Sequence, residues 1–393
     1  MLVDHVTIEQ GDGEARLAGR VGGHPLFWQV TGSRAFEPRG EPFVAALLPA
    51  AMRAGAPMEL PPELPVDPEF LANMDRLQSI FSRWFPALTP VAIHARRAPR
   101  QVPTVEAATG YSGGVDSSYT LDALGRDLDA ALLIDGIEYP HRDEELAARV
   151  TEELGTALRG RAIRLVQVLT NVKAAQRALG GRWAEGLGGA IASAVHVAGF
   201  STYQIAASNS WENLRPYGSH PLTDPLWSSA DVRIGHHGAE LRRIEKIRYL
   251  GHVPDLLEHV RVCFQGNAYN CGVCQKCLQT AAGFRALDLR SSVLPHLDNP
   301  RLLRKATVEH AGDLVDWQEI LLPDLERRDP ELHRELVALT RRYHWRKLIR
   351  DADRLMTGGR FRSMLRDVPE REPKPVESKE APPTGHSLPV SNG

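Results

Sequence analysis

Short apolar runs and amphipathic stretches alternate along the middle of the chain. The runs that predict strands are Val105–Ala108, Ala131–Leu133, Ile163–Leu169 and Tyr203–Ala206. Helical spacing of apolar residues occurs between them, at Glu144–Leu158 and Gly186–Ala198. Strands that alternate with helices are typical of a parallel sheet with helices on both faces. We therefore expect an α/β domain over residues 104–290.

The first hundred residues have a different pattern. Strand-like runs at Val3–Ile8, Ala15–Val21 and His24–Val30 are followed by helical spacing at Phe43–Ala54 and Phe70–Phe85, and by a last strand-like run at Val91–Ala95. A proline-rich connection separates the two helical segments. This order predicts a separate α+β domain over residues 1–103.

The last hundred residues favour helices and then a tail. Arg301–Leu322 and Pro330–Leu365 have helical character, which predicts a helical region over residues 291–367. From Val368 the composition turns to Pro, Glu, Lys and Ser. Such a segment buries too little apolar surface to order itself, so we expect a disordered tail over residues 368–393.

A glycine pair stands where the first strand of the α/β domain meets a helix. The segment reads Tyr111-Ser112-Gly113-Gly114-Val115-Asp116-Ser117-Ser118. Glycines at a strand-to-helix turn let an anion approach backbone N–H groups, and the helix N-terminus adds positive potential. Asp116 is a candidate ligand for Mg²⁺ on bound phosphates, and Ser112 and Ser117 are candidate donors to them. A plain tight turn capped by Asp116 and Ser117 is the alternative.

The string S-G-G-V-D-S resembles the pyrophosphate loop of the N-type ATP pyrophosphatases. The resemblance implies the adenine nucleotide alpha hydrolase-like (HUP) α/β fold. It also implies activation of a carboxyl or carbonyl oxygen as an adenylate, release of pyrophosphate, and attack by a nucleophile. ATP-binding roles then fall on Ser112, Gly113, Gly114, Val115, Asp116, Ser117 and Ser118, and Asp116 also counts as catalytic.

All four cysteines of the chain lie in one short run. They are Cys263, Cys271, Cys274 and Cys277, spaced C-x7-C-x2-C-x2-C. Four thiolates at this spacing can surround one tetrahedral Zn²⁺ in a closed, structural site. An iron–sulfur cluster on the same cysteines stays open, because ligand identity alone does not separate the two. Disulfides would be strained at the C-x2-C-x2-C spacing.

The loop and the cysteine cluster together resemble 7-cyano-7-deazaguanine synthases over residues 105 to 287. These enzymes use ATP and ammonia to convert a carboxylate, through an amide, into a nitrile. This sequence departs from their substrate loop in Ser208–Leu222, where the expected cysteine is absent. Polar and aromatic side chains of this loop are nevertheless substrate-binding candidates: Asn209, Trp211, Glu212, Arg215 and His220.

Three further charged residues complete the expected site. Asp135 ends the second strand of the α/β domain and is a candidate ATP contact, with an exposed carboxylate in a glycine turn as the alternative. Arg243 and Lys246 are candidate catalytic residues, because a cation there could stabilise departing pyrophosphate. A solvated pattern of charges on a helix would also explain this pair.

Charge and hydropathy limit the partners and the location. The net charge of −2 disfavours general nucleic-acid or membrane-surface binding. No apolar stretch approaches the ~20 residues that span a bilayer, and Met1–His5 does not begin a secretion signal. We expect a cytoplasmic protein with no membrane partner, and the sequence leaves a homodimer open.

The sequence therefore favours an ATP-dependent C–N ligase with ATP, Mg²⁺ and Zn²⁺ as cofactors. It would adenylate a small-molecule or modified-base carboxylate, and ammonia or an amine would then attack. One alternative is sulfur insertion into tRNA or a metabolite with an iron–sulfur cluster. The other is a non-catalytic nucleotide-binding module.

Overall fold

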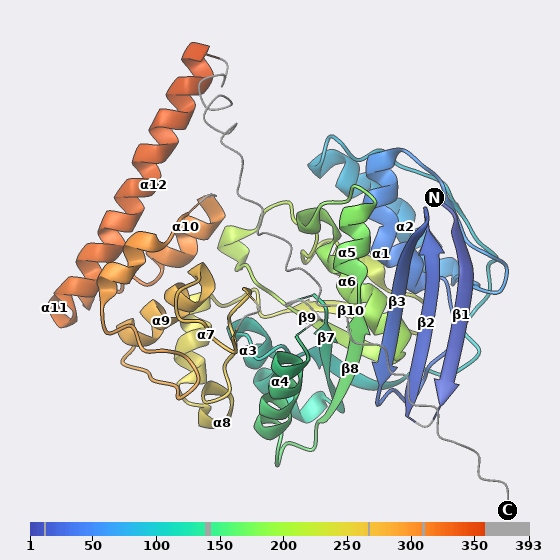
Figure 1. The fold of residues 1–393 in the computed structure, drawn as a ribbon, viewed down its shortest axis with the longest axis horizontal. Coiled ribbons are helices and arrows are strands. Elements are labelled where there is room, and N and C mark those ends of the chain that lie inside the picture. The colour runs from blue at the N-terminus through green and yellow to red at the C-terminus, as the bar shows by residue number, and fades with distance from the viewer. Residues whose placement is uncertain (12, 138–142, 266–267, 309–310, 358–393) are drawn as a thin grey trace, which may run out of the picture. The chain divides into compact units, whose positions relative to one another are not determined.

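An eight-stranded mixed sheet organises the structure, with the strand order β1-β2-β3-β8-β7-β6-β9-β10 (Figure 1). The computed structural model describes residues 1–11, 13–137, 143–265, 268–308 and 311–357. The strands of the sheet are β1 (Val3–Gly11), β2 (Glu14–Val21), β3 (His24–Thr31), β6 (Val105–Gly110), β7 (Ala130–Asp135), β8 (Arg164–Thr170), β9 (Phe200–Ala206) and β10 (Arg233–His237). Two short strands, β4 (Met58–Glu59) and β5 (Ile93–His94), pair separately.

The expected α/β class is confirmed by strands β6 to β10, which all pair in parallel. The chain runs outward from β6 through β7 to β8, then returns to the other side of β6 to form β9 and β10. Parallel crossovers are right-handed, so this reversal puts the helices before and after it on opposite faces of the sheet. A reversal of this kind also opens a crevice at the carboxyl ends of β6 and β9.

Helices flank the sheet on both sides (Figure 1). In the α/β part, α3 and α7 pack on each other, and α6 crosses β3, β8 and β9 on the other face with α1 against it. The helices up to β9 are α1 (Glu41–Ala54), α2 (Pro68–Trp84), α3 (Val115–Ala123), α4 (Glu144–Ala157), α5 (Val172–Ala178) and α6 (Trp183–Ala198). Those that follow β10 are α7 (Arg243–Leu250), α8 (Pro254–Leu257), α9 (Gln275–Ala286), α10 (Ala311–Gln318), α11 (Leu325–Arg328) and α12 (Pro330–Thr357).

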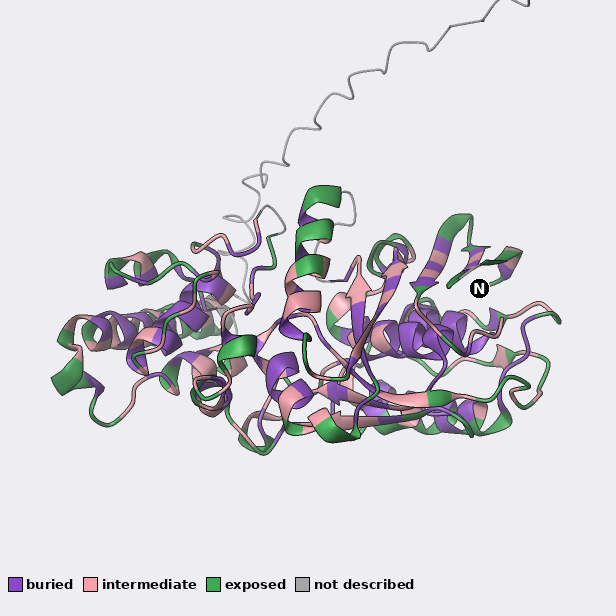
Figure 2. Cartoon of the chain, turned by 90° about the horizontal axis from the view of Figure 1, so that it is seen from below, coloured by how far each residue is buried: buried purple, intermediate pink, exposed green. Residues whose placement is uncertain are grey.

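Residues 1–103 do not form the separate domain that the sequence predicted. β3 pairs antiparallel with β8, from Trp28 opposite Thr170 to Thr31 opposite Gln167, so β1–β3 extend the same sheet. One apolar core runs through both parts, and it holds Trp28 and Phe43 together with Val195. Residues 1–340 accordingly form a single compact unit. Figure 2 shows the buried positions gathered on the sheet and on the helices packed against it.

The C-terminal region is helical where the structure describes it. The structure has two elements, a short 3₁₀ helix at Pro300–Lys305 and then α10, where one continuous helix was expected over Arg301–Leu322. α12 begins in the first compact unit and ends in the second, which starts at Arg341. The expected tail over residues 368–393 lies outside the described residues.

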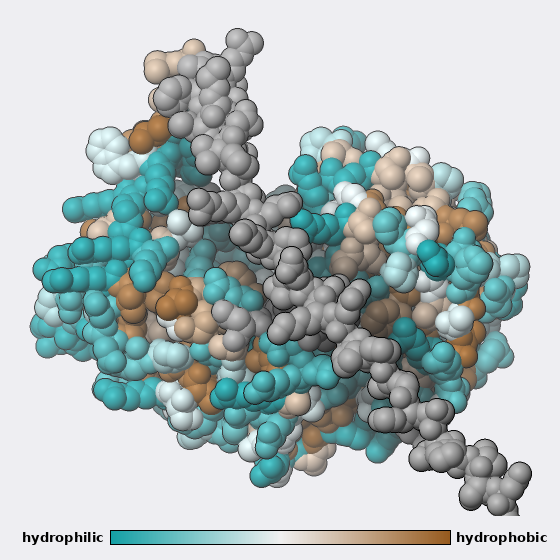
Figure 3. All heavy atoms as spheres, in the orientation of Figure 1, coloured by the Kyte–Doolittle hydropathy of each residue, from teal (hydrophilic) through white to brown (hydrophobic). Residues whose placement is uncertain are grey.

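The surface of the described residues is mixed in polarity. On the face drawn in Figure 3, hydrophilic side chains cover much of the surface between smaller apolar patches. Within the described ranges, no helix combines the length and the apolar character needed to cross a bilayer.

Replacing Trp28 with Ala tests whether the N-terminal strands share one core with the α/β part. Trp28 is fully buried, its indole N–H donates to Ser193 Oγ on α6 at 2.9 Å, and its ring meets Phe43 of α1 edge-on at 5.0 Å. Loss of this side chain should lower the free energy of unfolding by about 3–5 kcal/mol in denaturant titrations, in one transition. The control Trp211→Ala, at a 57% exposed side chain, should change it by less than about 0.5 kcal/mol. Independent melting of residues 1–103 would contradict the shared core.

Candidate functional site

The loop between β6 and α3 lies at the carboxyl end of β6, a strand inside the sheet. Gly113 has φ +76°, and a Cβ there would lie 2.9 Å from Leu154 Cδ2, so only glycine fits without strain. The carbonyl of Gly113 accepts a hydrogen bond from the Arg261 N–H at 2.8 Å, which fixes the turn. Gly114, the N-cap of α3, has no side chain to cap the first-turn amides. These amides and the helix dipole favour an anion at this point.

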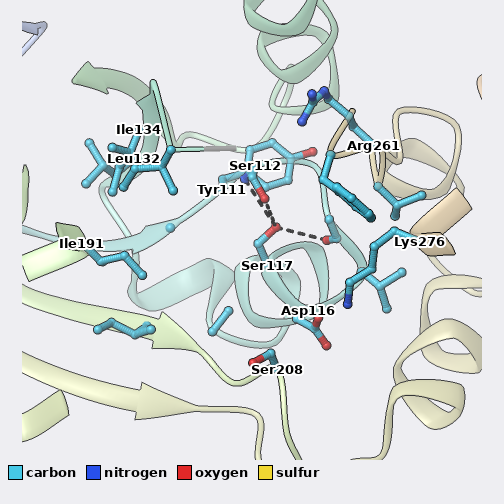
Figure 4. A pocket seen from close by; sticks show the side chains of 18 of the residues that line it. Tyr111, Ser112, Asp116, Ser117, Leu132, Ile134, Ile191, Ser208, Arg261 and Lys276 are labelled. Carbon is cyan, nitrogen blue, oxygen red and sulfur yellow. Dashed lines mark hydrogen bonds between the residues drawn. The ribbon is translucent and has the colours of Figure 1, made fainter. Parts of the chain in front are cut away.

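Hydroxyl groups shape the inside of the same loop. Ser117 Oγ accepts from the Ser112 N–H at 3.3 Å and donates to the Gly114 carbonyl at 3.1 Å. The Ser112 and Ser117 hydroxyls lie 3.4 Å apart, and Figure 4 draws this contact as a dashed line. Both serines line the pocket, whereas Ser118 is fully buried beneath the loop. The two hydroxyls are therefore placed to meet a ligand that enters the loop.

Asp116 joins the loop to α7 through two ion pairs. Arg243 Nη1 lies 2.7 Å from Asp116 Oδ2, and Lys246 Nζ lies 3.2 Å from Asp116 Oδ1. Both cations are buried, and each has a second partner: Lys246 donates to the Ala207 carbonyl at 2.6 Å, and Arg243 to Thr280 Oγ1 at 3.3 Å. The structure thus brings together the three residues expected to be catalytic.

Three positively charged side chains act on the Asp116 carboxylate. Burial alone would raise the pKa of Asp116, but the Lys246, Arg243 and Lys276 charges outweigh it and lower the pKa to about 2. The pKa of Lys276 is lowered by the nearby Arg243 charge and by burial. Asp313 and Asp316 of α10 offset part of this positive charge. The carboxylate is consequently ionised at neutral pH among three cations.

Sequence reasoning missed Lys276 and Arg261. Lys276 is on the first turn of α9, Arg261 precedes Cys263, and both line the pocket beside the loop. Neither belongs to a local motif for phosphate binding. The only signal for Lys276 was its place between two metal-ligand candidates, and Arg261 had none.

A pocket of about 390 Å³ opens over this loop. Figure 4 shows Leu132, Ile134 and Ile191 at one end and Asp116 with Lys276 at the other. Residues of β6, β7 and β9 line it, which places it at the reversal of strand order. One end can therefore take a flat apolar group and the other end an anion.

The expected substrate loop contributes less to this pocket than its sequence implied. Among the described residues, Ser208 and Tyr217 line the pocket from this loop, whereas the five candidates do not. Asn209 is half-buried, and Trp211 and Glu212 are exposed. Arg215 pairs with Asp313 of α10 at 3.4 Å, and His220 is buried against Trp84. Asp135 is half-buried at the end of β7 and does not line the pocket either.

The four cysteines meet in one cluster next to the pocket. The ligand atoms of Cys263, Cys271, Cys274 and Cys277 all lie within 4.8 Å of one another. A tetrahedral Zn²⁺ with bonds of ~2.3 Å needs sulfurs roughly 3.8 Å apart. The cluster can hold a metal ion such as zinc, and the short spacing suits one ion better than an iron–sulfur cluster, whose several atoms must fit between the ligands.

Backbone geometry prepares the cluster for metal. Gly272 has φ +70°, and this turn lets the Cys274 N–H donate to Cys271 Sγ at 3.3 Å. Burial raises the pKa of the Cys271 thiol, but backbone N–H donors from Val273 and Cys274, together with the Cys263 and Cys274 side chains, outweigh burial and lower this pKa to about 7. Burial raises the pKa of Cys274 and Cys277. Metal binding would deprotonate the thiols and release their protons.

Comparisons with protein-family models, with curated proteins and with solved structures found no match to this chain.

Asp116→Asn tests the ion pairs of the loop through the pH dependence of stability. The pKa of Asp116 is lowered from 3.8 to about 2, so its stabilisation is fully present above about pH 4 and is lost as the pH falls to about 2. The difference in unfolding free energy between wild type and variant should shrink by about 2 kcal/mol across this window. Denaturant titrations of both proteins at matched pH measure it. Acid releases metal from wild type and variant alike, so the measurement compares only the difference between their unfolding free energies. A difference that stays constant from about pH 4 to about pH 2 would contradict the prediction.

Elemental analysis tests the metal centre. We expect one zinc ion per chain in protein purified without chelators, and Cys277→Ser should lose it and destabilise the fold by several kcal/mol, because metal binding contributes directly to folding. Ser229→Ala, a buried position away from the cluster, should keep the zinc. Stoichiometric iron with visible absorbance would instead indicate an iron–sulfur cluster.

Proposed function

We propose that this chain is an ATP-dependent ligase of the N-type ATP pyrophosphatase class with a HUP-like fold. One observation carries the proposal: an uncapped helix N-terminus and a glycine turn meet Arg243 and Lys276, two of the three cations around Asp116, in one pocket at the strand-order reversal. This combination suits a polyphosphate more closely than any other common ligand. The apolar end of the pocket then suits the base of the nucleotide.

The same geometry supports transfer of the adenylyl group. A carboxylate oxygen of the acceptor would attack the α-phosphorus, and the bond from that phosphorus to the bridging oxygen of pyrophosphate would break. Arg243, buried but lining the pocket, can stabilise the charge that develops on pyrophosphate. Ammonia or an amine would then attack the acyl carbon and release AMP.

Asp116 has a positioning role in this proposal. Both of its carboxylate oxygens already accept from Arg243 and Lys246, so it fixes Arg243 at the edge of the pocket and Lys246 beside the Ala207 carbonyl. Mg²⁺ usually binds through substrate phosphates with only one or two carboxylates. We therefore expect Mg²⁺ to arrive with ATP and to rely on the protein for few direct ligands.

The cysteine cluster favours the ligase over sulfur insertion. The chain contains four cysteines, and all four converge on one site that suits a single ion. If that ion is bound, no thiol is left to carry a persulfide. Zinc at this site would stabilise α9 and the preceding segment and would take no part in the chemistry.

Arg243→Gln tests the proposal against a matched neighbour, Arg242→Gln. Arg243 lines the pocket, whereas Arg242 is exposed and pairs with Glu245 at 3.0 Å. Calorimetry with Mg-ATP should show binding weakened about 10- to 100-fold in Arg243→Gln, because a hydrogen bond to a charged group is lost. Arg242→Gln should bind within about twofold of wild type.

A pyrophosphate-release assay with carboxylate and ammonium mixtures provides the second measurement. Release that depends on ATP and acceptor supports the ligase, and its loss in Arg243→Gln assigns the activity to this pocket. Tight ATP binding with no release would favour the non-catalytic module. Absence of Mg-ATP binding to folded, metal-loaded protein would overturn the nucleotide site.

A further inference from the structure

One helical turn borders both the cysteine cluster and the pocket. The segment Cys274-Gln275-Lys276-Cys277 opens α9, with Cys274 as N-cap, and the Cys274 sulfur accepts from the Cys277 N–H at 3.5 Å. Cys277 is fully buried in the cluster, whereas Lys276 lines the pocket. Consecutive helical residues project about 100° apart, so neighbouring side chains serve two different sites.

Lys276 reaches the part of the pocket where phosphates would sit. Figure 4 shows its ammonium directed to the same end as the Asp116 carboxylate and the Ser112–Ser117 loop. It repels Arg243, and it is attracted by Asp116, Asp313 and Asp316. Arg243 also lines the pocket. Two cations from different helices thus approach one point, an arrangement that an anion between them stabilises.

The segment that carries the first cysteine of the cluster also lines the pocket. Cys263 and the residues beside it, Arg261, Val262 and Phe264, line the pocket as well. The Arg261 N–H holds the Gly113 carbonyl. An ion bound by Cys263 and by Cys274 and Cys277 would therefore join the segment that supports the glycine turn to the helix that carries Lys276.

We propose that Lys276 is a phosphate-binding residue of the pocket and that the metal holds it in position by fixing the first turn of α9. The inference rests on the proposed nucleotide site and adds a coupling between that site and the metal centre. Metal occupancy then sets the affinity for polyphosphates, while the affinity for the nucleoside part depends on the apolar end of the pocket.

Lys276→Met provides the first test, with Gln275→Met as matched control. Gln275 lies between the same two cysteines but is not among the described residues that line the pocket. In full-length zinc protein, Lys276→Met should bind Mg-ATP and inorganic pyrophosphate about 10- to 100-fold more weakly than wild type. Adenosine binding and zinc content should be unchanged in both variants, and Gln275→Met should bind Mg-ATP like wild type.

Metal removal provides the second test. Chelator-treated wild type that keeps its helical circular dichroism should bind Mg-ATP as weakly as zinc-loaded Lys276→Met. Removal of the metal from Lys276→Met should weaken Mg-ATP binding by at most about a further twofold. The metal and Lys276 act as one unit in this proposal, so the effects of losing each do not add. Equal affinity of zinc-loaded and metal-free wild type would overturn the coupling.

Cobalt substitution covers the case in which metal-free protein unfolds. Co²⁺ in a tetrahedral thiolate site has visible bands that respond to its surroundings. Pyrophosphate should shift these bands in wild type and leave them unchanged in Lys276→Met, and no shift in wild type would overturn the coupling. If wild type and Lys276→Met bind Mg-ATP equally well, the phosphate-binding role of Lys276 is refuted and the proposed function is not. Wild type that binds no Mg-ATP refutes the proposed function as well.

Discussion

The carboxylate of Asp116 is the contact on which the arrangement of the pocket depends. It lies in the first turn of α3, at the positive end of the helix dipole, and it accepts from Arg243 and Lys246 of α7. Burying three charged groups is costly, and the cost is offset only when each group keeps good partners. Arg243 and Lys246 meet this condition through Thr280 and the Ala207 carbonyl. The loop after β6, the end of β9, α7 and α9 are thereby held in one fixed geometry.

Features that depend on short stretches of consecutive residues were predicted well from the sequence. The strand before Gly113 and the helix after Gly114 are where the apolar pattern placed them, and the four cysteines converge as their spacing indicated. Such features depend on local backbone preferences and on short spacings. Asp116 belongs to this class, although its partners on α7 were expected only as candidates.

Features that depend on contacts between distant segments were predicted poorly. Lys276 belongs to no local phosphate motif, and only the fold brings it to the pocket that Asp116 of α3 also lines. Arg215 and His220, expected as ligand-binding groups, contact Asp313 and Trp84 and are not among the described residues that line the pocket. The strands of residues 1–31 were recognised. Their alternation of polar and apolar positions did not, however, predict that β8 is the neighbour of β3. A strand pattern specifies a face to bury and leaves the partner unspecified.

The junction of β3 with β8 has a consequence for the order in which the chain folds. The Phe27 N–H donates to Asn171 Oδ1, a contact between residues 144 positions apart. During synthesis the ribosome delivers the first three strands long before β8 exists, and a β-hairpin without a covering layer is marginally stable. Trp28 can pack against Phe43 of α1 early, but the edge of β3 gains its partner strand only when β8 has been made. The step that joins β3 to β8 is therefore a non-local pairing, and such pairings form slowly compared with contacts between neighbouring segments.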